Sequence, residues 1–139
     1  MSVSAGTFRW SDAYSVNVAL LDEQHQHLFE TIEELNQALQ AGNGNSAIEP
    51  VLFKLVDYAR FHFAAEESLM EQYDFPGLST HRMQHEMFRR KINEFLSEHA
   101  AGKAGVAVSV MFFMRDWLKR HVMTTDKHYS AYLNARGIR

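Results

Sequence analysis

The feature that most limits how this chain can fold is the spacing of its apolar residues, which recur alternately three and four positions apart in four long segments. Turn-forming stretches separate these segments at 42–45, 75–77 and 102–105. Such spacing is typical of the seam between near-antiparallel packed helices. The sequence therefore predicts an all-α fold, namely an up-down-up-down antiparallel four-helix bundle with an N-terminal arm and a short C-terminal helical segment.

Length and local capping signals refine this expectation. The chain has 139 residues, the length of one typical domain, so we expect residues 1–139 to form a single domain. Ser46–Glu49 matches the pattern of a capping box, and Pro50 is a residue that belongs near a helix start. We therefore expect the second helix to begin at this point.

Each apolar row also contains histidine, and the second row contains a glutamate. A single histidine in such a row is more often a hydrogen-bonded core residue than a metal ligand. A buried glutamate is harder to accommodate, because an unpaired carboxylate in a core costs several kcal/mol or becomes neutral. The polar residues in these rows are His25, His62, Glu66, His81, His85 and His121.

The positions of these six residues place them at one end of the predicted bundle. His25 lies near the start of the first helix and His121 near the end of the fourth, while the others lie late in the second helix or early in the third. These four helix ends meet in an up-down bundle. Two pairs within the set are spaced i, i+4, so each pair stacks on one helix face. We therefore expect all six residues in one layer of the core.

A second carboxylate, Asp126, follows His121 by five positions. On a regular α-helix, five positions correspond to about 140° around the axis, so the two side chains would point in different directions. For Asp126 to reach the layer that contains His121, the helix must break or bulge near residues 123–125. A role for Asp126 as a ligand therefore predicts an irregular helix at this point.

The donor atoms of these seven residues limit the metal that they can bind. Cysteine is absent, which excludes disulfides, thiolate-bound zinc, iron–sulfur clusters and thiol catalysis. Five imidazoles and two carboxylates suit first-row transition metals rather than calcium or magnesium, and they exceed what one four-coordinate zinc ion uses. Two six-coordinate ions, bridged by both carboxylates and one solvent oxygen, would keep one position open. A buried open position of this kind can bind a small diatomic molecule.

The same residues, in the same order, resemble the signature of a known family. A histidine is followed along the chain by HxxxE, HxxxH and HxxxxD, and the match extends over nearly the whole length. On these motifs the sequence is similar to the hemerythrin family, in particular to the small single-domain bacteriohemerythrins. The segments that carry the resemblance are Trp10-Ser11, Leu21–His25, His62–Glu66, His81–His85 and His121–Asp126.

The resemblance implies a non-haem centre of two iron ions (Fe2+/Fe3+) bridged by two carboxylates and an oxo or hydroxo group. Three histidines bind one ion and two bind the other, so the second ion has the open position where dioxygen binds. The implied ligands are His81, His85 and His121 for the first ion, His25 and His62 for the second, and Glu66 and Asp126 for the bridges.

The resemblance also implies an oxygen pocket next to the ion that has two histidines. Ordinary core packing explains the same apolar residues equally well, and one residue can serve both purposes. A dry pocket would exclude the water and anions that displace bound dioxygen. The implied pocket residues are Phe63, Trp117, Leu118 and Val122, with Trp10 and Tyr129 nearby.

The remaining three histidines do not fit the metal layer. His27 follows His25 by two positions, about 200° around a helix, so we expect it on the surface. We expect the same of His128, which follows Asp126 by two positions. His99 continues the inner row of the third helix at the opposite end of the bundle, and we expect it to be structural or partly exposed.

These expectations make reversible dioxygen binding the leading function, so that the protein would carry, store or deliver oxygen and would not be an enzyme. Two alternatives stay open: an oxygen or redox sensor, and a di-iron redox enzyme that acts on peroxide or nitric oxide. The expected partners are dioxygen and an unidentified oxygen-consuming protein. Iron storage is disfavoured, because seven committed ligands leave no exit route for the metal.

Charge and hydropathy exclude two further kinds of partner. The chain has 14 lysines and arginines against 17 aspartates and glutamates, with no basic block, so we expect no nucleic-acid binding. The longest apolar stretch, 104–114, is too short to span a bilayer, and residues 1–6 lack the features of a secretory signal. We therefore expect a cytoplasmic protein, and a monomer because the helices show no long exposed apolar row.

Overall fold

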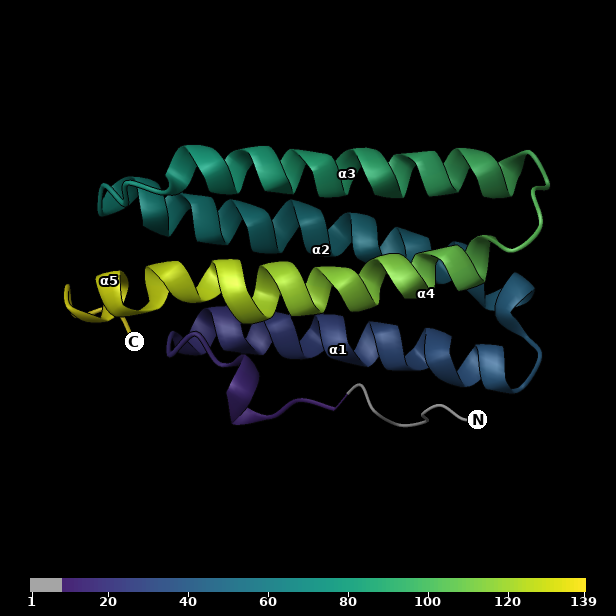
Figure 1. Ribbon diagram of the computed structural model, residues 1–139, viewed down its shortest axis with the longest axis horizontal. Helices are drawn as coiled ribbons and strands as arrows, with labels where there is room; N and C mark the ends of the chain where they lie inside the picture. The colour runs from purple at the N-terminus through teal and green to yellow at the C-terminus, as the bar shows by residue number, and fades with distance from the viewer. Residues whose placement is uncertain (1–8) are drawn as a thin grey trace.

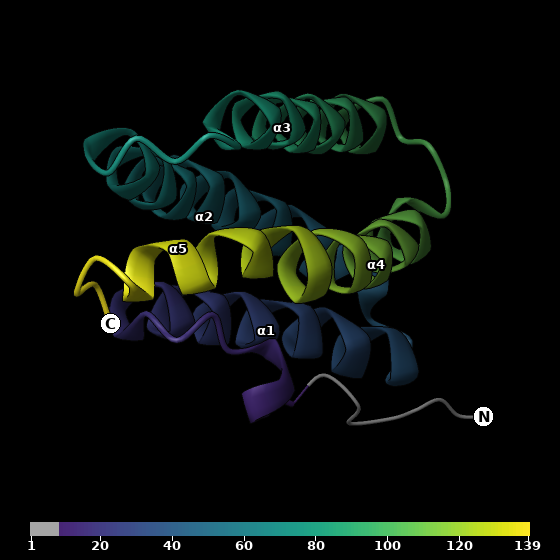
Figure 2. The ribbon, with the colours of Figure 1, turned by 60° about the vertical axis from the view of Figure 1, so that its left-hand side comes forward.

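The structure is a computed structural model that describes residues 9–139 of the chain. Four helices lie side by side in up-down order, as Figures 1 and 2 show. The described residues contain no strand, so the predicted all-α bundle is confirmed. The expectation about residues 1–6 concerns a segment outside the described residues. The helices are α1 (Ala19–Gln40), α2 (Gly44–Gln72), α3 (Leu78–Ala100) and α4 (Val106–Trp117).

The second helix begins earlier than the sequence predicts. It starts at Gly44, and the Ser46 hydroxyl donates to the carbonyl oxygen of Asn43 at 3.0 Å, so the predicted capping box is wrong. A Cβ atom at residue 44 would lie 2.6 Å from the Leu39 side chain, so glycine lets the turn between α1 and α2 pack closely. Pro50 therefore lies inside α2 instead of at its start.

The chain continues from α4 in the same direction but with a different winding (Figure 1). η2 (Leu118–Thr125) is a π-helix, η3 (Asp126–Tyr129) is a 3-10 helix, and α5 (Ser130–Asn134) is the predicted C-terminal helical segment. The hydroxyls of Thr124 and Thr125 each donate, at 3.1 Å, to the carbonyl oxygen five residues earlier, which matches the i, i+5 repeat of a π-helix. The irregularity predicted near residues 123–125 is therefore present.

The predicted N-terminal arm, which includes η1 (Asp12–Tyr14), is anchored by an aspartate near the start of α1. Asp22 accepts hydrogen bonds from the Val16 amide at 2.8 Å and from the Ser15 hydroxyl at 2.6 Å. The Ser130 hydroxyl in α5 donates to the carbonyl oxygen of Val16 at 2.6 Å. The arm and the C-terminal segment therefore close the same end of the bundle.

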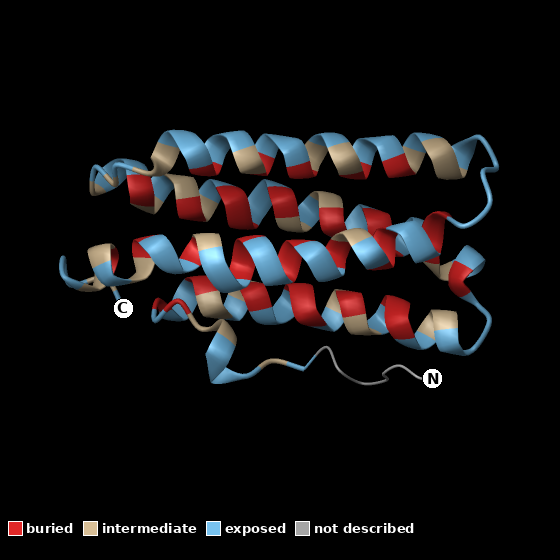
Figure 3. Ribbon diagram, in the orientation of Figure 1, coloured by how far each residue is buried: buried red, intermediate tan, exposed pale blue. Residues whose placement is uncertain are grey.

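Two clusters of buried apolar side chains fill the interior, and Figure 3 shows the buried residues on the inward faces of the helices. The larger cluster fills the middle of the bundle and the end where α1 joins α2. The smaller cluster closes the opposite end and consists of Val16, Val18, Leu21, Met70, Tyr129 and Leu133. A layer of buried polar residues lies between the two.

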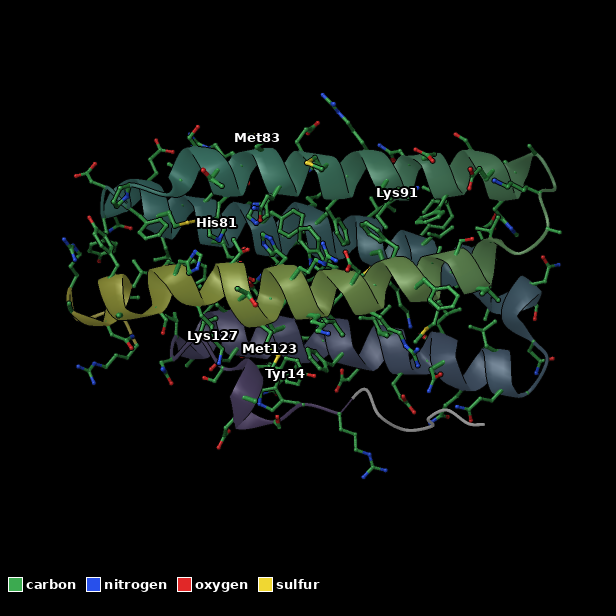
Figure 4. All side chains as sticks on the ribbon, viewed as in Figure 1. Tyr14, His81, Met83, Lys91, Met123 and Lys127 are labelled. Atoms are coloured by element: carbon green, nitrogen blue, oxygen red, sulfur yellow. The ribbon has the colours of Figure 1, made fainter. Side chains whose placement is uncertain are left out.

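The faces of the helices follow the predicted rows. His81 lies on the side of α3 that faces the other helices, whereas Met83, two positions later, points outward and is 61% exposed (Figure 4). Within residues 9–139, no helix has both the length and the hydropathy needed to cross a membrane.

Candidate metal centre

The polar layer contains all seven residues that the sequence predicts as ligands, and none of them is more than 3% exposed. α1 supplies one histidine, α2 supplies one histidine and the glutamate, and α3 supplies two histidines. The continuation of α4 supplies the last histidine from η2 and the aspartate from η3. The packing of the helices thus brings together His25, His62, Glu66, His81, His85, His121 and Asp126.

Glu66 has histidines on both sides of its carboxylate. Its Oε2 atom lies 3.1 Å from Nε2 of His62 and 3.7 Å from Nε2 of His25. Its Oε1 atom lies 3.1 Å from Nε2 of His85. The two oxygens of this carboxylate therefore face different histidines.

Asp126 divides its oxygens in the same way. Its Oδ2 atom lies 3.2 Å from Nε2 of His25, whereas Oδ1 lies 2.9 Å from Nε2 of His121 and 3.1 Å from Nε2 of His81. Taken together, Oε2 of Glu66 and Oδ2 of Asp126 face two histidines, whereas Oε1 and Oδ1 face the other three. Within each set, one nitrogen of every histidine except His81 and one oxygen of each carboxylate lie within 4.8 Å of one another. Each set, together with the two carboxylates, thus offers donor atoms that could hold a metal ion.

Several polar atoms of this layer are buried without a hydrogen-bond partner. Buried polar atoms are nearly always paired in folded proteins, because an unpaired one is costly. Imidazole nitrogens and carboxylate oxygens are donors that first-row transition metals bind, so bound ions would satisfy those that face inward. The unpaired atoms are Nδ1 and Nε2 of His25, Nε2 of His62, His85 and His121, Oε1 of Glu66 and Oδ2 of Asp126.

Three of the histidines are oriented by a hydrogen bond from Nδ1, the ring nitrogen that points away from the carboxylates. Their partners are amide or carboxylate oxygens, which only accept, so Nδ1 carries the proton and Nε2 keeps its lone pair toward the centre. This tautomer is the one that a metal ion requires at Nε2. The pairs are His62 with Gln24 at 2.6 Å, His85 with Glu67 at 2.7 Å and His121 with Gln84 at 2.7 Å.

Each of these partners stands next to a predicted ligand of the preceding helix. Gln24 is adjacent to His25 on α1 and accepts a hydrogen bond from the histidine of α2. In the same way, a residue adjacent to a predicted ligand of α2 accepts from a histidine of α3, and one adjacent to a predicted ligand of α3 accepts from the histidine of η2. Sequence analysis did not assign these partners, although a glutamine or glutamate beside a ligand was the available signal. Asp22, which also lies near His25 in sequence, anchors the arm instead.

Aromatic rings stack on three of the histidines. The Phe63 ring lies parallel to that of His85, with centroids 3.8 Å apart. The Trp117 ring stacks on His121 with centroids 4.0 Å apart. Two of the predicted pocket residues therefore pack directly against histidines of the layer.

The third stacked ring is one that sequence analysis missed. Tyr58, one helical turn before His62, stacks on that histidine with centroids 4.8 Å apart. Burial raises the pKa of the Tyr58 hydroxyl well above its usual value, the charges of Glu66 and Asp126 raise it further, and the indole N–H of Trp117 opposes the shift. The i, i−4 relation to a predicted ligand was the signal that pointed to this residue.

The other predicted pocket residues have different positions. Leu118 and Val122 are buried in the larger apolar cluster. The Tyr129 hydroxyl donates to Oε2 of Glu66 at 2.5 Å, so it supports a carboxylate of the layer. The Trp10 ring packs on Tyr14 and Phe29, with centroids 6.1 and 5.7 Å away, and none of its described ring contacts is with a histidine.

Burial and the two carboxylates set the protonation of the metal-free site. Burial lowers the pKa of His25, but the adjacent carboxylates of Asp126 and Glu66 outweigh it and raise this pKa to about 9. Burial dominates for His62 and lowers its pKa. Burial raises the pKa of both carboxyls, but the surrounding histidines overcome it and hold both below their usual values. Both carboxylates are therefore ionised at neutral pH.

The three remaining histidines lie outside this layer. His27 is exposed, with Nδ1 3.3 Å from the Glu30 carboxylate, and His128 is exposed as predicted. His99 is partly exposed at the other end of α3, 4.0 Å from the carboxylate of Glu49. The sequence reasoning therefore separated the inward-facing from the outward-facing histidines correctly.

Comparison with known proteins gives consistent matches. A sequence model of the family described as "Hemerythrin HHE cation binding domain" matches residues 16–133. Bacteriohemerythrin of Pseudomonas aeruginosa is 33% identical over 120 residues, which cover 86% of this chain and 77% of that protein. Bacteriohemerythrin of Methylococcus capsulatus is 31% identical over 127 residues, covering 91% and 96%.

More distant relatives extend the match to solved structures. Myohemerythrin of Sipunculus nudus is 28% identical over 124 residues, which cover 89% of this chain and 92% of that protein. A crystal structure of wild-type hemerythrin has a TM-score of 0.79 and 28% sequence identity to this chain. The alignment covers 94% of this chain and 97% of that chain, so the likeness extends over the whole bundle.

Proposed function

The chain belongs to the hemerythrin family, whose members bind dioxygen at a non-haem di-iron centre. From this premise we propose that the chain binds dioxygen reversibly at two iron ions and acts as an oxygen carrier, store or delivery protein rather than as an enzyme. The residues that would hold the iron ions are His25, His62, Glu66, His81, His85, His121 and Asp126.

The observation that carries the proposal is the division of each carboxylate between two unequal sets of histidines. Oε2 of Glu66 and Oδ2 of Asp126 face two imidazoles, whereas Oε1 and Oδ1 face three. The side with two imidazoles has one protein ligand fewer, so an exogenous molecule has a position there. When bound, the iron pair supplies the change of oxidation state that reversible dioxygen binding requires.

The protein's own residues orient the ligands and keep the site dry. The outer hydrogen bonds of three histidines fix the ring nitrogens that face the carboxylates. The stacked rings of Phe63 and Trp117 cover the side toward the middle of the bundle, and the smaller apolar cluster covers the side toward its end. Exclusion of water and anions from such a site favours release of dioxygen over its conversion to other products.

An optical oxygen titration of the reduced, iron-loaded protein tests the proposal. We expect about two iron ions per chain and a spectrum that cycles repeatedly as oxygen is added and removed. Finding one zinc ion or no metal would contradict the site. Rapid oxidation in one direction only would contradict the carrier role and favour a redox sensor or an enzyme that acts on peroxide or nitric oxide.

The proposal extends to the cellular setting, where we infer a cytoplasmic monomer that supplies dioxygen to an oxygen-consuming partner. The exposed large apolar side chains support the monomer, because those of α3 and α4 form i, i+4 pairs rather than long rows, as in Met83 with Met87 and Val108 with Phe112. Light scattering of the purified protein tests this expectation. A stable dimer at micromolar concentration would contradict it.

A further inference from the structure

Two buried hydrogen-bond donors beside the metal layer have no partner in the described part of the chain. They are the hydroxyl of Tyr58 and the indole Nε1–H of Trp117. Two other tyrosine hydroxyls of the described residues are paired: Tyr129 donates to Glu66, and Tyr132 donates to the carbonyl oxygen of Tyr73 at 2.6 Å. An unpaired buried donor is uncommon and requires an explanation.

Both donors lie immediately next to the predicted ligands. Tyr58 stacks on His62, and Trp117 stacks on His121. Phe63 lies between them, with its ring centroid 5.4 Å from that of Tyr58 and 5.8 Å from that of Trp117. The three rings therefore form one aromatic wall on the side of the layer that faces the middle of the bundle, and this wall carries two polar hydrogens.

Tyr58 belongs to the side of the centre that has fewer protein ligands. Its stacking partner, His62, is one of the two histidines that face Oε2 of Glu66 and Oδ2 of Asp126. A surface groove of about 220 Å³ between α1 and α2 is lined in part by Tyr58 and His62, so these two residues separate this side of the site from solvent. A molecule in the open position would therefore have Tyr58 as a neighbour.

We propose that the Tyr58 hydroxyl donates a hydrogen bond to the small molecule that occupies the open position beside His25 and His62. This inference rests on the proposed function. The phenol is protonated at neutral pH and can donate, and a donor held in a dry site favours ligands whose acceptor atom carries negative charge. Among molecules that reach the open position, this donor therefore favours those that carry or gain negative charge on binding over those that stay neutral.

The test compares Tyr58→Phe with the unaltered protein and with Tyr14→Phe, which removes the hydroxyl of a tyrosine on the arm. All three proteins are loaded with iron, their iron content is counted, and the oxidised forms are titrated with sodium azide. We expect about two iron ions in each, and azide affinity about tenfold weaker in Tyr58→Phe alone, since a hydrogen bond to a charged acceptor contributes at least this much. Resonance Raman bands of bound azide should shift between H2O and D2O in the unaltered protein and lose that shift in Tyr58→Phe.

Metal-free protein provides a second measurement that separates ligand binding from structural support. Removing an unpaired hydroxyl should leave the melting temperature of the metal-free Tyr58→Phe protein unchanged or higher. A lower melting temperature would show that the hydroxyl has a structural partner and would overturn the proposal. Unchanged azide affinity in variants that hold two iron ions would overturn it while leaving the proposed function intact. Failure of the unaltered protein to hold iron would overturn both.

Discussion

Nε2 of His121 lies 2.9 Å from Oδ1 of Asp126, although the two residues are five positions apart in the chain. A regular α-helix would separate such residues by about 140° around its axis. The π-helix η2 (Leu118–Thr125) is wound more widely, with i→i+5 hydrogen bonds, so residues five positions apart lie much closer to the same face. The irregular winding is therefore what allows the continuation of α4 to supply both a histidine and a carboxylate to the buried layer.

The side-chain hydrogen bonds of η2 lead to the first prediction. The hydroxyls of Thr124 and Thr125 each donate to the carbonyl oxygen five residues earlier, so they stabilise the wide turn. We expect the double variant Thr124→Ala/Thr125→Ala to lower the free energy of unfolding by about 1 to 2 kcal/mol and to weaken metal binding. Chemical denaturation and a metal titration measure the two effects.

Thr31→Ala is the matched control, because the Thr31 hydroxyl makes a similar bond to a carbonyl oxygen on an exposed face of α1. Loss of that hydroxyl should leave metal binding unchanged, since α1 has a regular winding there. Equal weakening of metal binding in both variants would show that η2 has no special need for its threonine hydroxyls.

The division between ligand and surface histidines leads to the second prediction. Glu66→Ala and His85→Ala each remove a predicted ligand from the buried layer, so we expect both variants to lose at least one iron ion. His27→Ala and His128→Ala change exposed side chains and should keep about two iron ions per chain. Elemental analysis of the purified proteins measures the iron content. Loss of iron from His27→Ala would contradict the assignment of the inner row.

The sequence was sufficient to predict the bundle and the layer of predicted ligands. The helical spacing shows which residues face inward, and their positions along the helices show at which end of the bundle they lie. His25 and His85 come from different helices, yet the three-and-four spacing of their rows places both in the core. Asp126 could be included only by predicting an irregular helix, and η2 confirms that irregularity. These predictions depend on backbone geometry, which periodicity reports directly.

Contacts between side chains of different helices could not be predicted in the same way. Gln24 lies beside His25 in sequence but binds His62 on the next helix, and this choice depends on how far the helices are rotated and shifted. The place of Trp10 against Phe29 depends on the path of the arm, which no periodicity describes. The start of α2 at Gly44 depends on close packing in the turn, which overrides the capping signal at Ser46.

The hydrogen bond between His85 and Glu67 leads to the third prediction. Glu67→Gln keeps an oxygen that can accept from Nδ1, whereas Glu67→Leu removes it and leaves the imidazole free to rotate or change tautomer. We expect Glu67→Leu to weaken metal binding by about 10- to 100-fold and Glu67→Gln to have a much smaller effect. A competition titration against a chelator measures both. Equal effects of the two variants would mean that the charge of Glu67 matters more than its geometry.

The raised pKa of His25 leads to the fourth prediction, which concerns metal uptake. A metal ion binds the neutral imidazole, but the carboxylates hold a proton on His25 up to about pH 9 in the metal-free protein. Uptake at neutral pH must therefore release this proton. We expect the affinity for cobalt(II) to rise by up to about tenfold per pH unit between pH 7 and 9, with proton release detectable by a pH indicator. His27→Ala should show the same slope, because His27 lies outside the layer.

The stability of the metal-free protein should have the opposite dependence on pH in this range. Because the pKa of His25 rises from 6.5 to about 9 on folding, its contribution is fully present below about pH 6.5 and is lost as the pH rises through 9. The pKa of His62 is lowered on folding, so this residue reduces stability below about pH 6.5. The pKa values of the two carboxylates are also lowered, so they stabilise the folded state above about pH 4 and lose that contribution in acid. We therefore expect a maximum near pH 6 to 7 and a fall of up to about 3 kcal/mol by pH 9. Urea denaturation of metal-free protein at a series of pH values measures this curve, and His25→Gln should flatten its alkaline side. A metal-free protein whose stability stays constant from pH 6.5 to 9 would show that His25 is neutral in the folded state.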